Sequence, residues 1–331
     1  MTRPAAKGWC PGAYKPMMSG DGLVVRVRPV MARLTRDQAL GLCETARTFG
    51  SGLIDLTSRA NLQIRGVSET DHEAVLERLA TLGLLPDDPA LESRRNMLVA
   101  PMWSEGDDTH RIATALIDRL ADLPELPAKV GYAIDIDGAP QFSENSADFR
   151  FERTADGALI LRADSASRGR PVTVDNALDA LIEMAEWFVK TGGPDNRRMA
   201  RHVMLTALPA EWQAALHAAP AQPLLPGQTP LGAVFGAAFG QIDADKLITL
   251  IAATQATAMR VTPWRFFLLE GAEIADTSHF ITDAADPLLT TDACPGAPLC
   301  AAATVETRQI ARQLAPIANG PLHVSGCAKG C

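Results

Sequence analysis

The apolar and polar positions of this chain change their period several times, and each change predicts an element. Residues 23–30 alternate as a half-buried strand does. Residues 35–49 place apolar side chains at helical spacing, and residues 52–67 hold two short β patterns around a turn. A second helical pattern covers residues 70–82 and ends at a glycine. The first 83 residues therefore predict a β-α-β-β-α unit, close to half of a ferredoxin-like domain.

Local signals extend this prediction along the chain. The two first helices each carry a capping box, Thr35 with Gln38 and Thr70 with Glu73. Residues 8–22 are dense in Gly and Pro and predict an extended arm. The later patterns predict strands and helices with the following bounds: strands 126–138 and 157–164, helices 109–123, 175–190 and 243–254.

One stretch of the chain repeats another. Residues 260–272 echo residues 55–67 when Thr57 is aligned with Thr262, and a predicted helix precedes each copy. The alignment also places Gly66 on Gly271. A chance similarity between two hairpins is the alternative, because the match lies in pattern more than in identity. The repeat predicts two copies of the ferredoxin-like half.

Composition narrows the class of protein. The chain has 331 residues, of which 47% are hydrophobic and 21% charged, and its net charge is −8. This length is enough for more than one domain, and no basic stretch suggests nucleic-acid binding. No apolar run is long enough to span a bilayer, and the first residues lack the apolar core of a signal peptide. We therefore expect a cytoplasmic protein.

Four cysteines near the end of the chain carry the clearest chemistry. They form two pairs in Gly- and Pro-containing loops, Cys294 with Cys300 and Cys327 with Cys331. Four thiolates from two tight loops are what a 4Fe–4S cluster requires, so all four are predicted metal ligands. Disulfides are disfavoured in a reducing compartment, and the five-residue gap is long for a zinc loop. Four unconnected buried cysteines are the remaining alternative.

These motifs resemble the sirohaem nitrite and sulfite reductase superfamily, which has C-x5-C followed by G-C-x2-G-C. The resemblance implies an α+β fold with duplicated ferredoxin-like half-domains and α/β cluster domains. It also implies that Cys331 bridges the cluster to a sirohaem iron, and that the chain ends short of the family's full length. The implied domains are an arm at 1–22, half-domains at 23–88 and 225–280, a first reductase-like domain at 89–210, and the start of a cluster domain at 285–331.

Three basic residues fall on further motifs of this superfamily. Arg59 falls on its T-x-R motif, Arg95 on R-N and Lys129 on P-x-K. The resemblance implies that these side chains hold the carboxylates of a tetrapyrrole and serve as cofactor-binding and catalytic residues. Arginine suits that role because its planar guanidinium pairs bidentately with carboxylates. For each residue the alternative is a solvated surface charge.

Two departures point to one branch of the superfamily. Gly131 stands where sulfite reductases commonly have a second lysine, which removes one cation from the distal pocket. The arm from Cys10 to Leu23 resembles the start of the precorrin-3B synthase branch. That resemblance implies a monooxygenase of aerobic cobalamin biosynthesis, which uses O2 and a 4Fe–4S cluster to hydroxylate precorrin-3A at C20 and form a γ-lactone. Sirohaem or a mononuclear non-haem iron is the implied O2-activating centre.

Two alternative functions stay open at this point. One is a sirohaem-dependent nitrite or sulfite reductase, which the cysteine motif fits equally well. The other is a non-catalytic Fe–S module that transfers electrons. No G-x-G-x-x-G dinucleotide fingerprint is present, so a reduced pyridine nucleotide is expected to act through a separate reductase protein.

Overall fold

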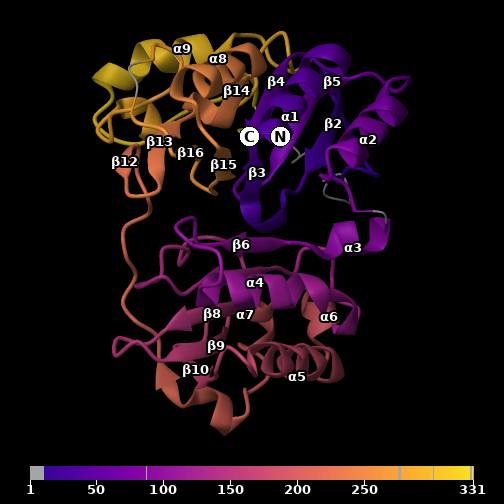
Figure 1. The fold of residues 1–331 in the computed structure, drawn as a ribbon, viewed down its shortest axis with the longest axis vertical. Helices are drawn as coiled ribbons and strands as arrows, with labels where there is room; N and C mark the ends of the chain where they lie inside the picture. Colours follow the sequence, from indigo (N-terminus) through magenta and orange to yellow (C-terminus); the bar gives the residue numbers. More distant parts are fainter. Residues whose placement is uncertain (1–10, 87, 275–276, 301, 329, 331) are drawn as a thin grey trace. The chain divides into compact units, whose positions relative to one another are not determined.

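The computed structural model describes residues 11–86, 88–274, 277–300, 302–328 and 330 (Figure 1). The chain divides into two units. The first combines residues 1–87 with residues 225–331, and the second comprises residues 88–224. The chain thus leaves the first unit, forms the whole of the second, and returns to complete the first.

The first unit begins with one copy of a ferredoxin-like half. Its strands are β1 (Met17–Ser19), β2 (Gly22–Val27), β3 (Arg33–Thr35), β4 (Leu53–Leu56) and β5 (Leu62–Val67), with the 3-10 turn η1 (Val30–Ala32) and the helices α1 (Arg36–Phe49) and α2 (His72–Thr81). The capping box of α1 is confirmed, since Thr35 and Gln38 each bond the other's backbone N–H. Fully buried residues such as Val25, Ile54 and Ile64 form part of the apolar core of this half-domain.

Residues 225–272 repeat this order from the first strand to the last, without a described counterpart of α2. The second copy consists of β12 (Gly227–Thr229), β13 (Gly232–Gly236), η4 (Ala238–Gly240), β14 (Gln241–Asp243), α8 (Ala244–Thr254), β15 (Ala258–Val261) and β16 (Phe266–Glu270). The two hairpin turns match in detail. Thr57 N–H bonds to Asn61 O at 2.9 Å, and Thr262 N–H bonds to Phe266 O at 3.0 Å. Gly66 and Gly271 both have a φ of 72°. The repeat predicted by aligning Thr57 with Thr262 is therefore a structural repeat.

The two copies exchange one strand each. The sheet orders are β1-β2-β5-β4-β14 and β12-β13-β16-β15-β3. Strand β14 of the second copy pairs antiparallel with β4, placing Ile242 opposite Ile54, and β3 of the first copy pairs with β15, placing Leu34 opposite Met259. Helices α1 and α8 pack against each other (Figure 1). Each sheet is thus incomplete without a strand from the other copy.

The second unit is built on a six-stranded sheet of order β11-β10-β9-β8-β7-β6. Strands β6 and β7 pair in parallel, as do β7 and β8, whereas β8, β9, β10 and β11 pair antiparallel. Its buried core includes Phe149, Phe151 and Phe188. The strands are β6 (Met97–Val99), β7 (Tyr132–Asp135), β8 (Phe149–Arg153), β9 (Leu159–Ala163), β10 (Arg168–Pro171) and β11 (Ala215–Leu216). The helices are α3 (Pro89–Arg94), α4 (Asp108–Asp118), η2 (Leu120–Asp122), α5 (Ala177–Lys190), α6 (Gly193–Asn196), α7 (Met199–His202) and η3 (Ala210–Gln213).

Several predicted boundaries were wrong. The strand predicted at 126–138 is confined to β7, because residues before it form a loop and turn. Helix α2 has Asp71 as its N-cap and lacks the predicted Thr70–Glu73 box, since Ser68 Oγ accepts the Asp71 N–H instead. The predicted arm is partly a strand, because β1 pairs antiparallel with β2.

Candidate functional site: two cysteine loops and three basic residues

The two cysteine loops leave neighbouring parallel strands. Strand β17 (Thr291–Ala293) pairs in parallel with β18 (Leu322–Val324), with Ala293 opposite Val324. Cys294 follows β17 directly, and the second loop begins directly after β18. The remaining elements of this region are η5 (Pro287–Thr290), α9 (Thr307–Leu314) and η6 (Ala315–Ile317). Because parallel strands end at the same edge of a sheet, the two predicted ligand loops meet there.

Cys294 lies at the junction of the two loops. The Gly326 N–H of the second loop donates to Cys294 Sγ at 3.3 Å, and the Cys294 N–H donates to Val324 O at 3.1 Å. Burial raises the pKa of the Cys294 thiol, but the N–H groups of Gly326 and Gly296 outweigh that effect and hold it below its usual value. Donors that favour a thiolate are suited to a metal-ligating sulfur.

Thr307 fills the space between the loops. This fully buried residue opens α9, and its Oγ1–H donates to Cys294 O at 2.5 Å. Two loop glycines approach it closely. A Cβ on Gly296 would lie 2.5 Å from Thr307 Oγ1, and one on Gly326 would lie 3.1 Å from Thr307 Cγ2 and 2.7 Å from Ala303 Cβ. The glycines are therefore required by close packing around the Cys294 loop.

Cys300 and Cys327 are half-buried on the same two loops, and Cys331 lies outside the described residues. The Cys300 N–H donates to Gly296 O at 2.7 Å, and the loops are joined where the Thr304 N–H donates to Gly326 O. Within the described part of the chain, no group of three or more His, Cys, Asp or Glu side chains is gathered to hold a metal ion. The thiol donors, the N–H on sulfur and the glycine-lined loops fit a 4Fe–4S cluster, and the four-cysteine ligand set stays a prediction.

The hairpin of the second repeat fixes the first cysteine loop. Arg265, at the turn between β15 and β16, pairs with the carboxylate of Asp292 and also donates to Thr291 O at 3.4 Å. Asp292 lies in β17, two residues before Cys294. The corresponding turn of the first repeat, between β4 and β5, carries Arg59, which is half-buried. The two equivalent hairpin turns therefore each carry an arginine. Arg265 contacts the strand that leads to Cys294, and Arg59 is a predicted anchor for a tetrapyrrole.

Arg95 and Lys129 lie on adjacent loops of the second unit. Arg95 follows α3 and precedes β6, while Lys129 lies in a turn before β7, and these two strands are parallel neighbours. The buried Asn96 ties the loops together, because its Nδ2 donates to Ala128 O at 3.0 Å and Val130 O at 3.2 Å. Burial lowers the pKa of the half-buried Arg95, whereas the Lys129 side chain is exposed. The R-N and P-x-K motifs therefore form one structural patch.

A cavity of about 620 Å³ opens beside these loops. Arg94, Asn96 and Tyr132 contribute to its wall, together with Pro127 and Ala128 of the P-x-K motif. Burial raises the pKa of the Tyr132 hydroxyl, which keeps it protonated. Arg94 donates to the carbonyls of Leu123 and Pro124, so this arginine supports the loop that leads to Lys129.

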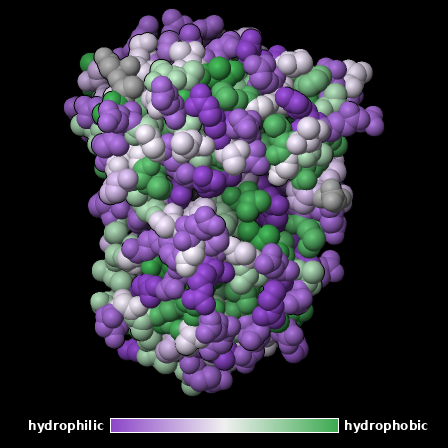
Figure 2. All heavy atoms as spheres, viewed as in Figure 1, coloured by the Kyte–Doolittle hydropathy of each residue, from purple (hydrophilic) through white to green (hydrophobic). Residues whose placement is uncertain are grey.

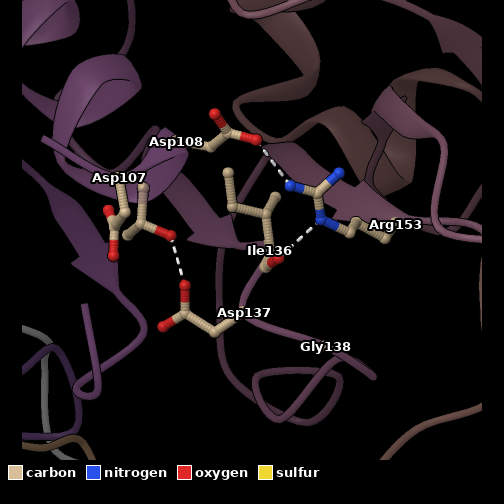
Figure 3. A pocket seen from close by; sticks show the side chains of 7 residues that line it. Asp107, Asp108, Ile136, Asp137, Gly138 and Arg153 are labelled. Carbon is tan, nitrogen blue, oxygen red and sulfur yellow. Dashed lines mark hydrogen bonds and ion pairs between the residues drawn. The ribbon is translucent and has the colours of Figure 1, made fainter. Parts of the chain in front are cut away.

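A second pocket of about 470 Å³ lies elsewhere in the same unit and is acidic (Figure 3). Its carboxylates have internal partners. Asp107 caps α4 by accepting the His110 N–H, Asp108 pairs with Arg153 at 2.7 Å, and Asp137 accepts a hydrogen bond from Thr109 at 2.5 Å. Asp107 thus serves as a helix cap, and Asp108 and Asp137 are engaged by Arg153 and Thr109, so the carboxylates of this pocket have structural roles.

Several other polar residues support the fold. Arg65 is buried and pairs bidentately with Asp21, and Arg198 pairs with the buried Asp148, so both serve the fold. The contributions of Asn96 and Thr307 could not be read from the sequence, because each bonds backbone atoms that only the folded chain brings near. Gly131 is buried, and its N–H donates to Asp148 Oδ2 at 3.0 Å.

Comparisons with known proteins place this arrangement in a family. Residues 15–82 match the nitrite/sulfite reductase ferredoxin-like half domain. The structure of the Mycobacterium tuberculosis NirA protein superposes with a TM-score of 0.67 over 93% of this chain and 68% of that one, at 17% identity. It supports the fold alone. In the part of the chain that the structure describes, no helix is long and apolar enough to cross a membrane, and polar and apolar groups are interspersed over the face in Figure 2.

Two curated relatives define the branch. A ferredoxin–nitrite reductase of Synechococcus elongatus is 29% identical, but over only 38% of this chain and 27% of its own length. A precorrin-3B synthase of a Sinorhizobium species is 30% identical over 98% of this chain and 78% of its own length. The relatives are oxidoreductase-type enzymes. The chain therefore belongs to the precorrin-3B synthase family, within the nitrite and sulfite reductase superfamily.

Proposed function

We propose that this enzyme hydroxylates precorrin-3A at C20 in an O2-dependent reaction that closes a γ-lactone on the macrocycle, a step of aerobic cobalamin biosynthesis. The observation that carries the proposal is the match to a precorrin-3B synthase along 98% of the chain. The nitrite reductase match covers 38% of the chain and gives the reductase alternative less support. The proposed reaction consumes one O2 and two electrons, so that one oxygen atom enters the substrate and the other leaves as water.

The substrate is proposed to bind through its carboxylates. Arg59 stands at the β4–β5 turn, and Arg95 and Lys129 stand on loops that Asn96 joins. A tetrapyrrole with many carboxylates offers a partner to each cation, and bidentate pairing by the two arginines would fix its orientation. Gly131 adds no cation beside Lys129, which favours a large carboxylated substrate over a small oxyanion that needs several positive donors.

The cysteine loops are proposed to hold a 4Fe–4S cluster through Cys294, Cys300, Cys327 and Cys331. The cluster would supply electrons that originate from a reduced pyridine nucleotide and arrive through a separate reductase protein. The protein's own contribution is a set of N–H donors on Cys294 Sγ and a glycine-lined packing around Thr307. A sirohaem or a mononuclear iron is proposed as the O2-activating centre.

Binding of precorrin-3A to single variants tests the assignment of the anchors. We expect Arg59→Ala, Arg95→Ala and Lys129→Ala each to weaken binding about tenfold or more, since each removes a charged partner of a carboxylate. Arg47→Ala and Lys190→Ala are the matched controls, because these exposed residues make surface ion pairs. Affinities that fall no further in the three variants than in the two controls would remove these residues from the substrate site.

A further inference from the structure

Helix α9 follows the first cysteine loop and carries two arginines, Arg308 and Arg312. The helix begins at Thr307, which packs directly on Cys294, and Arg308 is the next residue. One helical turn further on, Arg312 is exposed and its guanidinium lies 5.2 Å from the ring centre of Phe239. The two arginines share a helix but occupy different environments.

The guanidinium of Arg308 has buried N–H donors without a partner among the described residues. Its Nε and Nη1 atoms are both buried and donate no hydrogen bond to any residue that the structure describes. Buried N–H groups of a charged side chain are costly to leave unpaired, so nearly all of them are satisfied in folded proteins. An acceptor other than the described polypeptide is therefore expected beside Arg308.

The surroundings of Arg308 favour an anion. Burial lowers the pKa of Arg308, Asp55 and Cys294 raise it, and the neighbouring cations Arg65 and Arg312 lower it. The guanidinium groups of Arg65 and Arg312 add positive charge near Arg308, which would attract an anion. Asp55 already accepts a hydrogen bond from Gln241 at 3.1 Å and lies 3.5 Å from Arg65, so it is shared among several donors. Cys294 is the neighbouring group that a bound metal centre would involve.

We propose that Arg308 donates from Nε and Nη1 to the sulfur atoms of the 4Fe–4S cluster and offsets its negative charge. This inference rests on the cluster of the proposed function. Four thiolates and the inorganic sulfides make such a centre anionic, and hydrogen bonds to its sulfurs are known to set its reduction potential. A buried guanidinium beside Cys294 would therefore favour the reduced form, which carries one more negative charge, and raise the potential.

Two substitutions at Arg308 separate the effect of its positive charge from the effect of losing the arginine side chain. Arg308→Lys keeps the positive charge, whereas Arg308→Gln removes it. Arg312→Gln is the matched control, with the same charge change on the same helix. Iron and sulfide content after anaerobic reconstitution is measured on each full chain, followed by a redox titration monitored by electron paramagnetic resonance. Precorrin-3A binding is measured in parallel.

We expect Arg312→Gln to resemble the wild type, and Arg308→Lys, which keeps the charge but loses the two guanidinium donors, to fall between the wild type and Arg308→Gln. Arg308→Gln should bind less iron or show a midpoint potential lower by about 59 mV or more, which corresponds to a tenfold weaker preference for the reduced cluster. Equal iron content and potential in the Lys and Gln variants would overturn the proposal, whether both are normal or both fail. An unchanged cluster with weaker precorrin-3A binding in Arg308→Gln would also overturn it, and would make a substrate carboxylate the acceptor. A wild-type chain that takes up no iron would overturn the cluster itself.

Discussion

The sharpest steric prediction concerns Gly326, which lies between Cys294 and Thr307. A Cβ at this position would meet Ala303 Cβ at 2.7 Å and Thr307 Cγ2 at 3.1 Å, both below ordinary van der Waals contact. Overpacking of this kind costs about 1–3 kcal/mol. Since the Gly326 N–H donates to Cys294 Sγ, the displacement needed to relieve the clash also removes a donor from a predicted ligand. We therefore expect Gly326→Ala to weaken cluster binding by about 5- to 150-fold.

A double-mutant cycle isolates this clash. Ala303→Gly removes the closest opposing atom, so the Gly326→Ala/Ala303→Gly chain should recover part of the loss, while the Thr307 contact keeps the rest. The assay is the release of iron to a chelator at increasing chelator concentration, with urea unfolding of each chain alongside. If Gly326→Ala holds iron as firmly as the wild type, the packing argument fails. If the double variant is no better than the single one, Ala303 is not the obstacle.

Three further predictions concern buried polar groups. Thr307→Val should lower the free energy of unfolding by about 1–3 kcal/mol, because it removes the hydroxyl that donates to Cys294 O. Thr307→Ser keeps a hydroxyl and should lower the free energy of unfolding by less. Urea unfolding measures both variants. Asn96→Leu should destabilise the second unit by about 2–4 kcal/mol and weaken precorrin-3A binding, because the Ala128 and Val130 carbonyls lose their donor and the loop of Lys129 is released. Burial raises the pKa of Asp135 from 3.8 to about 7, so its protonated form is favoured in the fold. The stability that this brings is full below about pH 4 and is lost as the pH rises through 7, and Asp135→Asn should remove that dependence in urea unfolding from pH 4.5 to 7.5.

Each of these predictions has a contrary result. Equal stability of the Val and Ser variants would show that the Thr307 hydroxyl contributes nothing. Unaltered binding in a destabilised Asn96→Leu chain would separate the Asn96 contacts from the substrate site. If wild type and Asp135→Asn lose stability in parallel over this pH range, Asp135 is ionised in the fold, as the N–H donors of Gln141 and Phe142 would favour.

Local signals predicted the elements whose stabilising contacts are local. The capping box at Thr35 placed the start of α1 correctly, and the alignment of Thr57 with Thr262 located the second hairpin. Contacts between residues far apart in the chain gave no such signal. The exchange of β3 and β14 between the two sheets depends on pairing partners about 200 residues away, and the short segments show no pattern that names them.

The candidate site, too, was predicted only in part from the sequence. The spacing of the cysteines predicted two loops, and the structure shows that they leave parallel strands and meet at Cys294. Asn96 belongs to the predicted R-N motif, but its hydrogen bonds to the distant Ala128 and Val130 carbonyls were not predicted. Arg308 was missed, because its sequence position gives no signal of its buried donors. β8 was also missed, although Phe149 and Phe151 alternate with Arg150 and Glu152, because the run is only five residues long. These two charged residues are buried as partners of Asp164 and Arg162, which the alternation does not predict.

The most direct test of the account runs three substrates on one iron-loaded preparation. Precorrin-3A is supplied with O2 and an electron donor, and nitrite and sulfite are supplied with reduced viologen. We predict O2-dependent conversion of precorrin-3A to a hydroxylated lactone, with negligible reduction of nitrite or sulfite. Rapid turnover of nitrite or sulfite together with unreacted precorrin-3A would contradict the assignment and identify the enzyme as a reductase.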